Sequence, residues 1–254
     1  MLRSHRWRTA ANSAAYLLPI LQPGMRLLDV GCGPGTLTID LAARVAPAEV
    51  VGIDVNADVV AEAAGGARER GQDNVTFLAG DFRTADLPAA SFDVVHAHQV
   101  LQHLRAPVAA LVAMGRLAAP GGLIAVRDSD YASMVWHPDS EALTRWLGVY
   151  QAVTARNGAD ANAGRRLLAW ASEAGLRDVV YTTSTWTFAR PEDRSWWGEL
   201  WAQRIVASAL AEQAVDYGIA SPAELQELAA GWREWAAAPR AVFVVTHGEV
   251  VARV

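Results

Sequence analysis

The stretch LLDVGCGPGT, residues 27–36, is an apolar run that ends in a turn with three glycines. The apolar residues predict a buried β-strand, and the glycines allow positive φ angles and the close approach of a ligand. Residues 36–45 then carry apolar side chains at a helical period. The first amides of such a helix have no partner within it, so its N-terminus favours a polar or anionic group. A strand, a glycine turn and a helix at the start of an α/β sheet commonly bind a nucleotide-like cofactor.

Details of the turn indicate which cofactor this is. A dinucleotide fingerprint has its third glycine where this chain has Thr36, whereas the spacing here is G-x-G-x-G after Asp29. This pattern resembles the first motif of the class I S-adenosylmethionine (SAM) methyltransferases, and the resemblance covers residues 9–130. Within that family the chain is similar to the small-molecule branch that contains the quinone-biosynthesis C-methyltransferases. The resemblance implies SAM as the cofactor and S-adenosylhomocysteine (SAH) as the product.

The alternation of strands and helices predicts a parallel sheet with helices on both faces. Strands are expected at residues 27–30, 49–56, 74–82, 92–98, 123–127 and 178–188 and within 241–254, with an N-terminal helix over 9–21. We therefore expect a doubly wound, Rossmann-like α/β sheet of seven strands, mostly parallel, with an antiparallel last strand.

The chain is expected to divide into four parts. Residues 1–130 would form the SAM-binding half with its N-terminal helix, and residues 131–190 would complete the core with helices and the sixth strand. Residues 191–240 would form a tryptophan-rich helical cap, and residues 241–254 the final strand. The last helix of the cap begins with a capping box, Ser221-Pro222-Ala223-Glu224. Such helices could line a pocket or pack a homodimer.

Acidic residues follow the second and third strands. Asp54 lies 19 positions after Gly35, where an acid can accept both ribose hydroxyls of an adenosine, while Asn56 is free to cap the next helix. The resemblance places Asp81 against the adenine amino group and Phe82 beside the ring. The other cofactor-binding residues that it implies are Tyr16, Asp29, Gly31, Cys32, Gly33, Val55, His98 and Gln99.

The catalytic candidates follow the fourth and fifth strands. His98 ends the fourth strand and aligns with a family motif near the transferred methyl group, so it is a candidate general base or substrate contact; a structural or cofactor-side histidine is the alternative. Asp130 and Tyr131 could position or deprotonate a substrate, or simply form a turn. The substrate-binding candidates are Tyr131, Trp197, Trp201 and Arg204. We expect no metal, because His96-x-His98 lacks a complete ligand set of recognisable spacing.

Composition limits the partners and the compartment. The chain of 254 residues is 52% hydrophobic and 19% charged, with a net charge of −5, which is a poor match to nucleic acid or an anionic membrane. Cys32 is the only cysteine, so no intrachain disulfide forms, which fits a reducing compartment. No apolar run reaches 18 residues, and the basic N-terminus lacks a signal-peptide cleavage site. A cytoplasmic protein with a small-molecule substrate is expected.

The leading hypothesis is SAM-dependent methyl transfer to an O, N or C atom of a small organic acceptor in a capped pocket. An NAD-type oxidoreductase shares the glycine turn and the acid after the second strand, but Thr36 and the position of Asp81 count against it. The third hypothesis is a non-catalytic SAM-binding protein.

Overall fold

The computed structural model describes residues 3–254, which divide into two compact units. We call residues 3–128, 163–183 and 248–254 the core unit, and residues 129–162 and 184–247 the helical unit. Among the described residues, every helix is too short or too polar to span a lipid bilayer.

The core unit is built on a sheet whose first five strands are parallel and run in the order β3-β2-β1-β4-β5. These strands are β1 (Leu27–Val30), β2 (Val50–Asp54), β3 (Val75–Ala79), β4 (Phe92–His98) and β5 (Ala118–Ser129). The long strand β8 (Val242–Arg253) follows β5 in the order, and β7 (Arg177–Phe188) pairs with β8. The predicted fold class, a mostly parallel Rossmann-like sheet with an antiparallel C-terminal strand, is confirmed.

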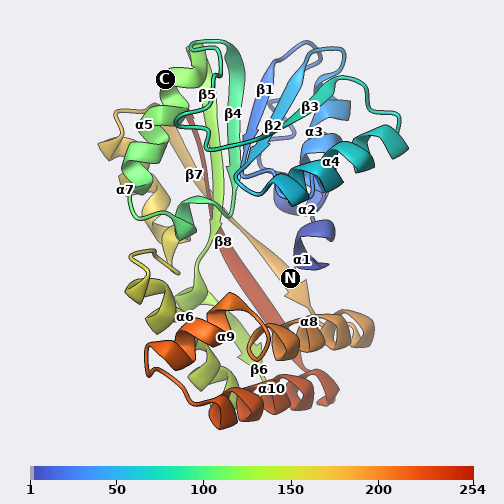
Figure 1. The fold of residues 1–254 in the computed structure, drawn as a ribbon, viewed down its shortest axis with the longest axis vertical. Coiled ribbons are helices and arrows are strands. Elements are labelled where there is room, and N and C mark those ends of the chain that lie inside the picture. The colour runs from blue at the N-terminus through green and yellow to red at the C-terminus, as the bar shows by residue number, and fades with distance from the viewer. Residues whose placement is uncertain (1–2) are drawn as a thin grey trace. The chain divides into compact units, whose positions relative to one another are not determined.

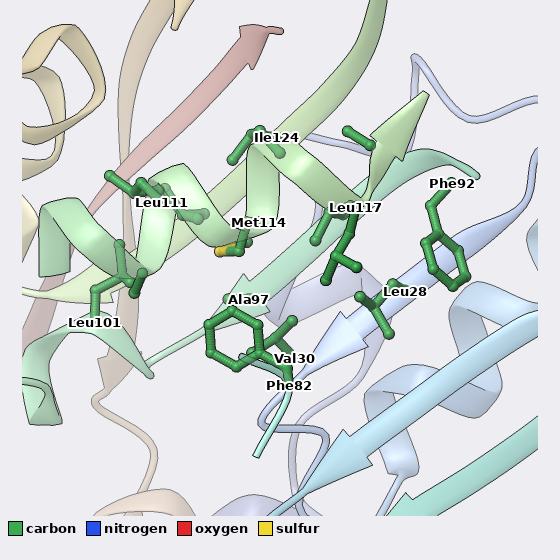
Figure 2. Close-up of a cluster of buried hydrophobic side chains, with 14 of the residues drawn as sticks. Leu28, Val30, Phe82, Phe92, Ala97, Leu101, Leu111, Met114, Leu117 and Ile124 are labelled. Atoms are coloured by element: carbon green, nitrogen blue, oxygen red, sulfur yellow. The ribbon is translucent and has the colours of Figure 1, made fainter. Parts of the chain in front are cut away.

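One face of the core sheet packs against α5 (Pro107–Leu117) and α7 (Leu167–Glu173). Leu28 and Val30 of β1 belong to this face, because alternate side chains of a strand point the same way. Figure 2 shows Met114 of α5 among the side chains of this cluster. The whole cluster is shielded from solvent, as expected for a parallel strand layer covered by helices.

The other face of the core sheet is covered by α2 (Ala10–Ser13) and α3 (Thr36–Val45), on the opposite side from α5 in Figure 1. Leu27 of β1 and Val94 of β4 pack on this face. Helix α4 (Ala57–Glu69) follows β2 and has Asn56 as its N-cap, as predicted. Burial on both faces accounts for the continuous apolar runs of these strands.

The helical unit contains α6 (Glu141–Arg156), α8 (Pro191–Arg204), α9 (Ala209–Asp216) and α10 (Pro222–Ala237). Helix α10 begins where the capping box was predicted, and the Ser221 side chain accepts the Glu224 amide N–H at 3.2 Å. The Glu224 carboxylate also pairs with Arg145 of α6 at 2.5 Å, and Arg145 and the Ser221 backbone amide together lower the pKa of this carboxyl. A short strand, β6 (Val135–His137), pairs antiparallel with β8 and brings the sheet to eight strands.

The N-terminal helix predicted over residues 9–21 is wrong in extent. The structure has two short helices, α1 (Arg3–Arg6) and α2, followed by turns through residue 20. Helix α2 ends six positions before Pro19, so the proline does not set this boundary; beyond it, the Leu17 and Ile20 amides bond to carbonyls three residues back, as in successive tight turns.

Two further predictions at the strands need correction. Strand β5 begins at Ala118 rather than at residue 123 as predicted, and its register against β4 shifts after Phe92. The structure also adds β6 to the seven strands expected, since a strand of three residues gives too little alternation to be seen in a sequence. The final strand β8 runs unbroken through His247-Gly248.

Candidate functional site

A cavity of about 370 Å³ opens in the core unit at the carboxyl ends of the parallel strands. We call it the core pocket. Eight of the eleven predicted cofactor-binding residues line it, namely Gly31, Gly33, Asp54, Val55, Asp81, Phe82, His98 and Gln99. They come from the ends of four neighbouring strands, which is where open α/β sheets bind ligands.

The glycine turn forms the floor of this pocket. Gly31 and Gly33 have φ angles of +69° and +54°, which L residues rarely adopt. A Cβ atom on Gly31 would clash with the side chain of Val100 from the loop after β4. A Cβ atom on Gly33 would have only the His5 ring within 4 Å, so the backbone at Gly33 leaves room for a ligand.

Asp54 stands at the end of β2 with both oxygens engaged by the backbone. Its Oδ2 accepts the Gly33 N–H and its Oδ1 accepts the Asn56 N–H, both at 3.0 Å. Each carboxylate oxygen can accept a second hydrogen bond, so two remain for a ligand. Asn56 caps α4 by accepting the Asp58 and Val59 amides, which confirms that Asp54 is not needed as the cap.

Asp81 and Phe82 follow β3. Arg83 donates to Asp81 through Nε at 2.9 Å and through Nη2 at 2.5 Å, and these bonds hold the pKa of the Asp81 carboxyl below its usual range. This local pair was not predicted from the sequence. Phe82 is 9% exposed and belongs to the buried cluster between the sheet and α5, where it lies beside Val30 in Figure 2. An apolar ring therefore borders the pocket next to an acid.

His98 lies at the last position of β4 and is 4% exposed. It borders both the core pocket and a smaller cavity next to the glycine turn. The next residue, Gln99, has a φ of +54°, and its N–H donates to the Arg127 carbonyl at 2.7 Å. The backbone thus turns sharply here and presents His98 to the pocket.

Asp29 and Cys32 lie beside the smaller cavity rather than in the core pocket. Asp29 accepts a hydrogen bond from Thr38 Oγ1 at 2.5 Å and pairs with His96 Nδ1 at 2.7 Å. Its carboxylate therefore ties β1 to α3 and β4. Burial raises the pKa of the Cys32 thiol well above its usual range, so the thiol stays protonated and packs as a small side chain. Across residues 3–254, no three His, Cys, Asp or Glu side chains gather as a metal site.

The N-terminal segment supplies two pocket residues that the sequence analysis missed. His5 and Arg8 line both cavities, and Arg8 Nη2 hydrogen-bonds to Gln99 Oε1. The segment is anchored by Arg6, which forms two bonds to Glu62 of α4 at 2.6 and 2.9 Å. The only signal in the sequence was the run of basic residues, which carries no spacing rule that points to a cofactor.

Tyr16 does not line the core pocket. Its hydroxyl is buried without a hydrogen-bond partner among the described residues, and burial, followed by the charge of Glu249, raises its pKa. It lies near a buried ion pair in which Arg127 Nε contacts Glu249 Oε1 at 3.0 Å. The structure thus places Tyr16 near Arg127 and Glu249, two of the buried polar side chains that we call the polar layer of the sheet. The contact of Tyr16 with the cofactor stays a prediction.

The predicted substrate-binding residues all belong to the helical unit, where they gather in one aromatic cluster. Tyr131 stacks on Tyr150 with ring centroids 3.9 Å apart and meets Trp201 edge-on at 6.4 Å. Trp197 lies 6.0 Å from Trp201, and the Arg204 guanidinium lies 4.7 Å above the Trp201 ring.

Asp130, the third catalytic candidate, also lies in the helical unit. Its Oδ1 accepts the Ser133 N–H at 3.2 Å and caps the short 3-10 helix Tyr131–Ser133. This contact is the turn that the sequence analysis kept as the alternative to a catalytic role.

A strand-end pocket over a glycine turn, with acids after β2 and β3, defines a Rossmann-like nucleotide-cofactor protein. Residues 21–175 match the family described as a methyltransferase domain. An uncharacterised methyltransferase of Schizosaccharomyces pombe is 33% identical over 257 residues, which covers 98% of this chain and 91% of that protein. The chain therefore belongs to the methyltransferase domain family. It is a SAM-dependent methyltransferase with SAM as its cofactor, and the oxidoreductase alternative is wrong.

Two solved structures show the same fold. The [4+2]-cyclase SpnF matches with a TM-score of 0.58 at 24% identity, over 96% of this chain and 78% of that one. A geranyl diphosphate methyltransferase in complex with SAM matches with a TM-score of 0.55 at 17% identity, over 98% of this chain and 86% of that one. The narrower resemblance to the quinone-biosynthesis branch stays a prediction.

Proposed function

We propose that the protein transfers the methyl group of SAM to an O, N or C atom of a small organic acceptor. The observation that carries this proposal is the core pocket, in which residues for each part of an adenosine-based cofactor converge at four strand ends. When bound, SAM supplies a methyl group that its sulfonium already activates. The residues of the core pocket would hold SAM so that an acceptor could approach the methyl carbon in line.

The lining residues fit such a cofactor from one end of the pocket to the other. Asp54 keeps two acceptor positions for the ribose hydroxyls, and Asp81 and Phe82 provide an acid and an apolar surface for the adenine. At the glycine turn, Arg8 offers the positive charge that the methionyl carboxylate needs, and the His5 ring lies beside it in the lining. Asp29 is bound to Thr38 and His96, so it acts by ordering the turn.

His98 is the proposed general base or acceptor contact. It is buried at the end of β4 and borders both cavities in the glycine-turn region. A hydroxyl or carbon acid must lose a proton as the new bond forms, and His98 would take it. A positioned base of this kind typically contributes about 10²–10⁴-fold in rate. A neutral amine would attack without a strong base.

The aromatic cluster of the helical unit is proposed to bind the acceptor. Tyr131, Trp197 and Trp201 are the proposed ring contacts, although their side chains are buried and pack on one another, and Arg204 lies beside them as a cation. Asp130 already caps a 3-10 helix, so it is the weakest of the catalytic candidates. We further infer a cytoplasmic enzyme, a small-molecule substrate rather than nucleic acid, and no membrane partner, which the net charge of −5 and the single cysteine support. The tryptophan-rich helices could also pack a homodimer, and this stays a prediction.

The test is SAH formation from SAM in the presence of a panel of small alcohols, phenols, amines and carbon acids. We expect His98→Asn to lower kcat by about 10²–10⁴-fold for hydroxyl or carbon acceptors while SAH binding changes little. Tyr131→Phe and Asp130→Asn serve as comparisons. If wild-type protein binds SAH and a variant that combines these three substitutions turns over every acceptor as fast as wild type, the catalytic assignment is wrong.

A further inference from the structure

The loop after β4, residues 99–104, forms one wall of the core pocket in an unusual conformation. Gln99 adopts a φ of +54°, which residues other than glycine rarely adopt. Val100 packs against Gly31, and His103 and Leu104 also line the pocket. A strained turn of this kind persists only where surrounding contacts hold it.

Two consecutive residues of β5 hold this loop. The Arg127 carbonyl accepts the Gln99 N–H at 2.7 Å, and Asp128 Oδ1 accepts the Gln102 N–H at 3.0 Å. Asp128 is fully buried, and its Oδ2 has no hydrogen-bond partner among the described residues. Asp128 does not itself line the core pocket, so any influence on the ligand passes through the loop.

The surroundings of Asp128 set the pH at which it is charged. Burial raises the pKa of Asp128 to about 7, while the amides of Gln102 and Leu101 and the charges of Arg8 and Arg127 oppose this rise. The other titratable groups on neighbouring elements are His98 on β4, His103 in the loop, Tyr16 in the N-terminal turns and Glu249 on β8, which pairs with Arg127.

We propose that Asp128 is a positioning residue that, as a carboxylate, fixes loop 99–104 against the glycine turn and so shapes the wall of the cofactor pocket. A charged acceptor binds an amide N–H more strongly than a neutral one does. The bond to Gln102 is therefore strongest when Asp128 is ionised, and the loop loosens as the pH falls through neutrality. This inference rests on the proposed use of the core pocket for SAM.

The test compares wild type with Asp128→Asn, which keeps the size and the acceptor oxygen but removes the charge. SAH binding is measured by calorimetry at pH 8 and pH 5.5, with the exposed Asp73→Asn as the matched control. We expect the Asp128 variant to bind about fivefold more weakly than wild type at pH 8, and equally at pH 5.5 where both side chains are neutral. Asp73→Asn should match wild type at both values.

A thermal melt separates positioning from mere support of the fold. An aspartate in the unfolded chain ionises near pH 4, whereas folded Asp128 keeps its proton to about pH 7, so stability falls as the pH rises through that window. Asp128→Asn avoids this loss and should melt at a higher temperature than wild type at pH 8. A positioning role for Asp128 predicts that Asp128→Asn melts at a higher temperature than wild type at pH 8 and yet binds SAH more weakly.

Hydrogen exchange of residues 99–104 without ligand gives a second readout. At pH 8 these amides should exchange faster in Asp128→Asn than in wild type after correction for intrinsic rates. Failure of wild type to bind SAH would count against the proposed function alone, since the exchange result still tests the loop. Equal exchange and equal SAH affinity of the two proteins at pH 8 would overturn the inference.

Discussion

Arg8 is a basic residue of the N-terminal segment that lines the core pocket, most of which is formed at the strand ends. It lines both cavities at the glycine turn and hydrogen-bonds to Gln99, whereas Asp54 and Asp81 are the proposed contacts of the adenosine. A hydrogen bond to a charged group contributes about 1.5–3 kcal/mol, so Arg8→Ala should weaken SAH binding by at least about tenfold.

The matched control is Arg233→Ala, which removes the same charge from an exposed pair with Glu199 in the helical unit. Exposed pairs contribute little, so its SAH affinity and its stability should stay close to wild type. Calorimetry on the three proteins checks this prediction. Equal affinity of Arg8→Ala and wild type would remove Arg8 from the cofactor site.

At the scale of elements, the glycine turn packs closely against the loop after β4, because Gly31 lies against the side chain of Val100. Gly31→Ala introduces both an unfavourable positive φ and a clash with Val100, whereas Gly71→Ala introduces only the positive φ, because its Cβ would meet open space. We expect Gly71→Ala to cost about 1–2 kcal/mol of folding free energy and Gly31→Ala clearly more.

Adding Val100→Ala to Gly31→Ala should recover part of the loss, since the clash is relieved while the φ cost stays. Denaturant unfolding of the single and double variants gives this coupling. Additive effects of the two substitutions would mean that the loop does not press on the turn as the structure shows.

The elements that the sequence predicted well are those with strong local signals. The strand before the glycine turn, the Asn56 cap and the start of α10 depend on residues a few positions apart. The N-terminal helix was overextended because local periodicity does not distinguish a continuous helix from the series of turns that follows Ser13. The short strand β6 exists only through its pairing with β8, more than 100 positions away.

At the scale of the whole molecule, most predicted cofactor residues converge because the carboxyl ends of parallel strands share one edge of a sheet. The polar layer of the sheet could not be predicted, because His96 and Asp29 lie 67 positions apart and Arg127 and Glu249 lie 122 positions apart. Only the fold shows that Tyr16 belongs to this layer. The burial of Asp128 could likewise not be predicted, because it depends on how the loop after β4 packs on β5.

The central claim is that the core pocket binds an adenosine-based methyl donor through Asp54. Calorimetric titration with SAH and, separately, with NAD tests it most directly, using wild type, Asp54→Ala and the exposed Asp73→Ala. We expect SAH alone to bind, with an affinity about a hundredfold lower in Asp54→Ala, as two lost hydrogen bonds to a charged group predict, and unchanged in Asp73→Ala. Binding of NAD alone would contradict a methyl-donor pocket. Equal SAH affinity of Asp54→Ala and wild type would contradict the role of Asp54.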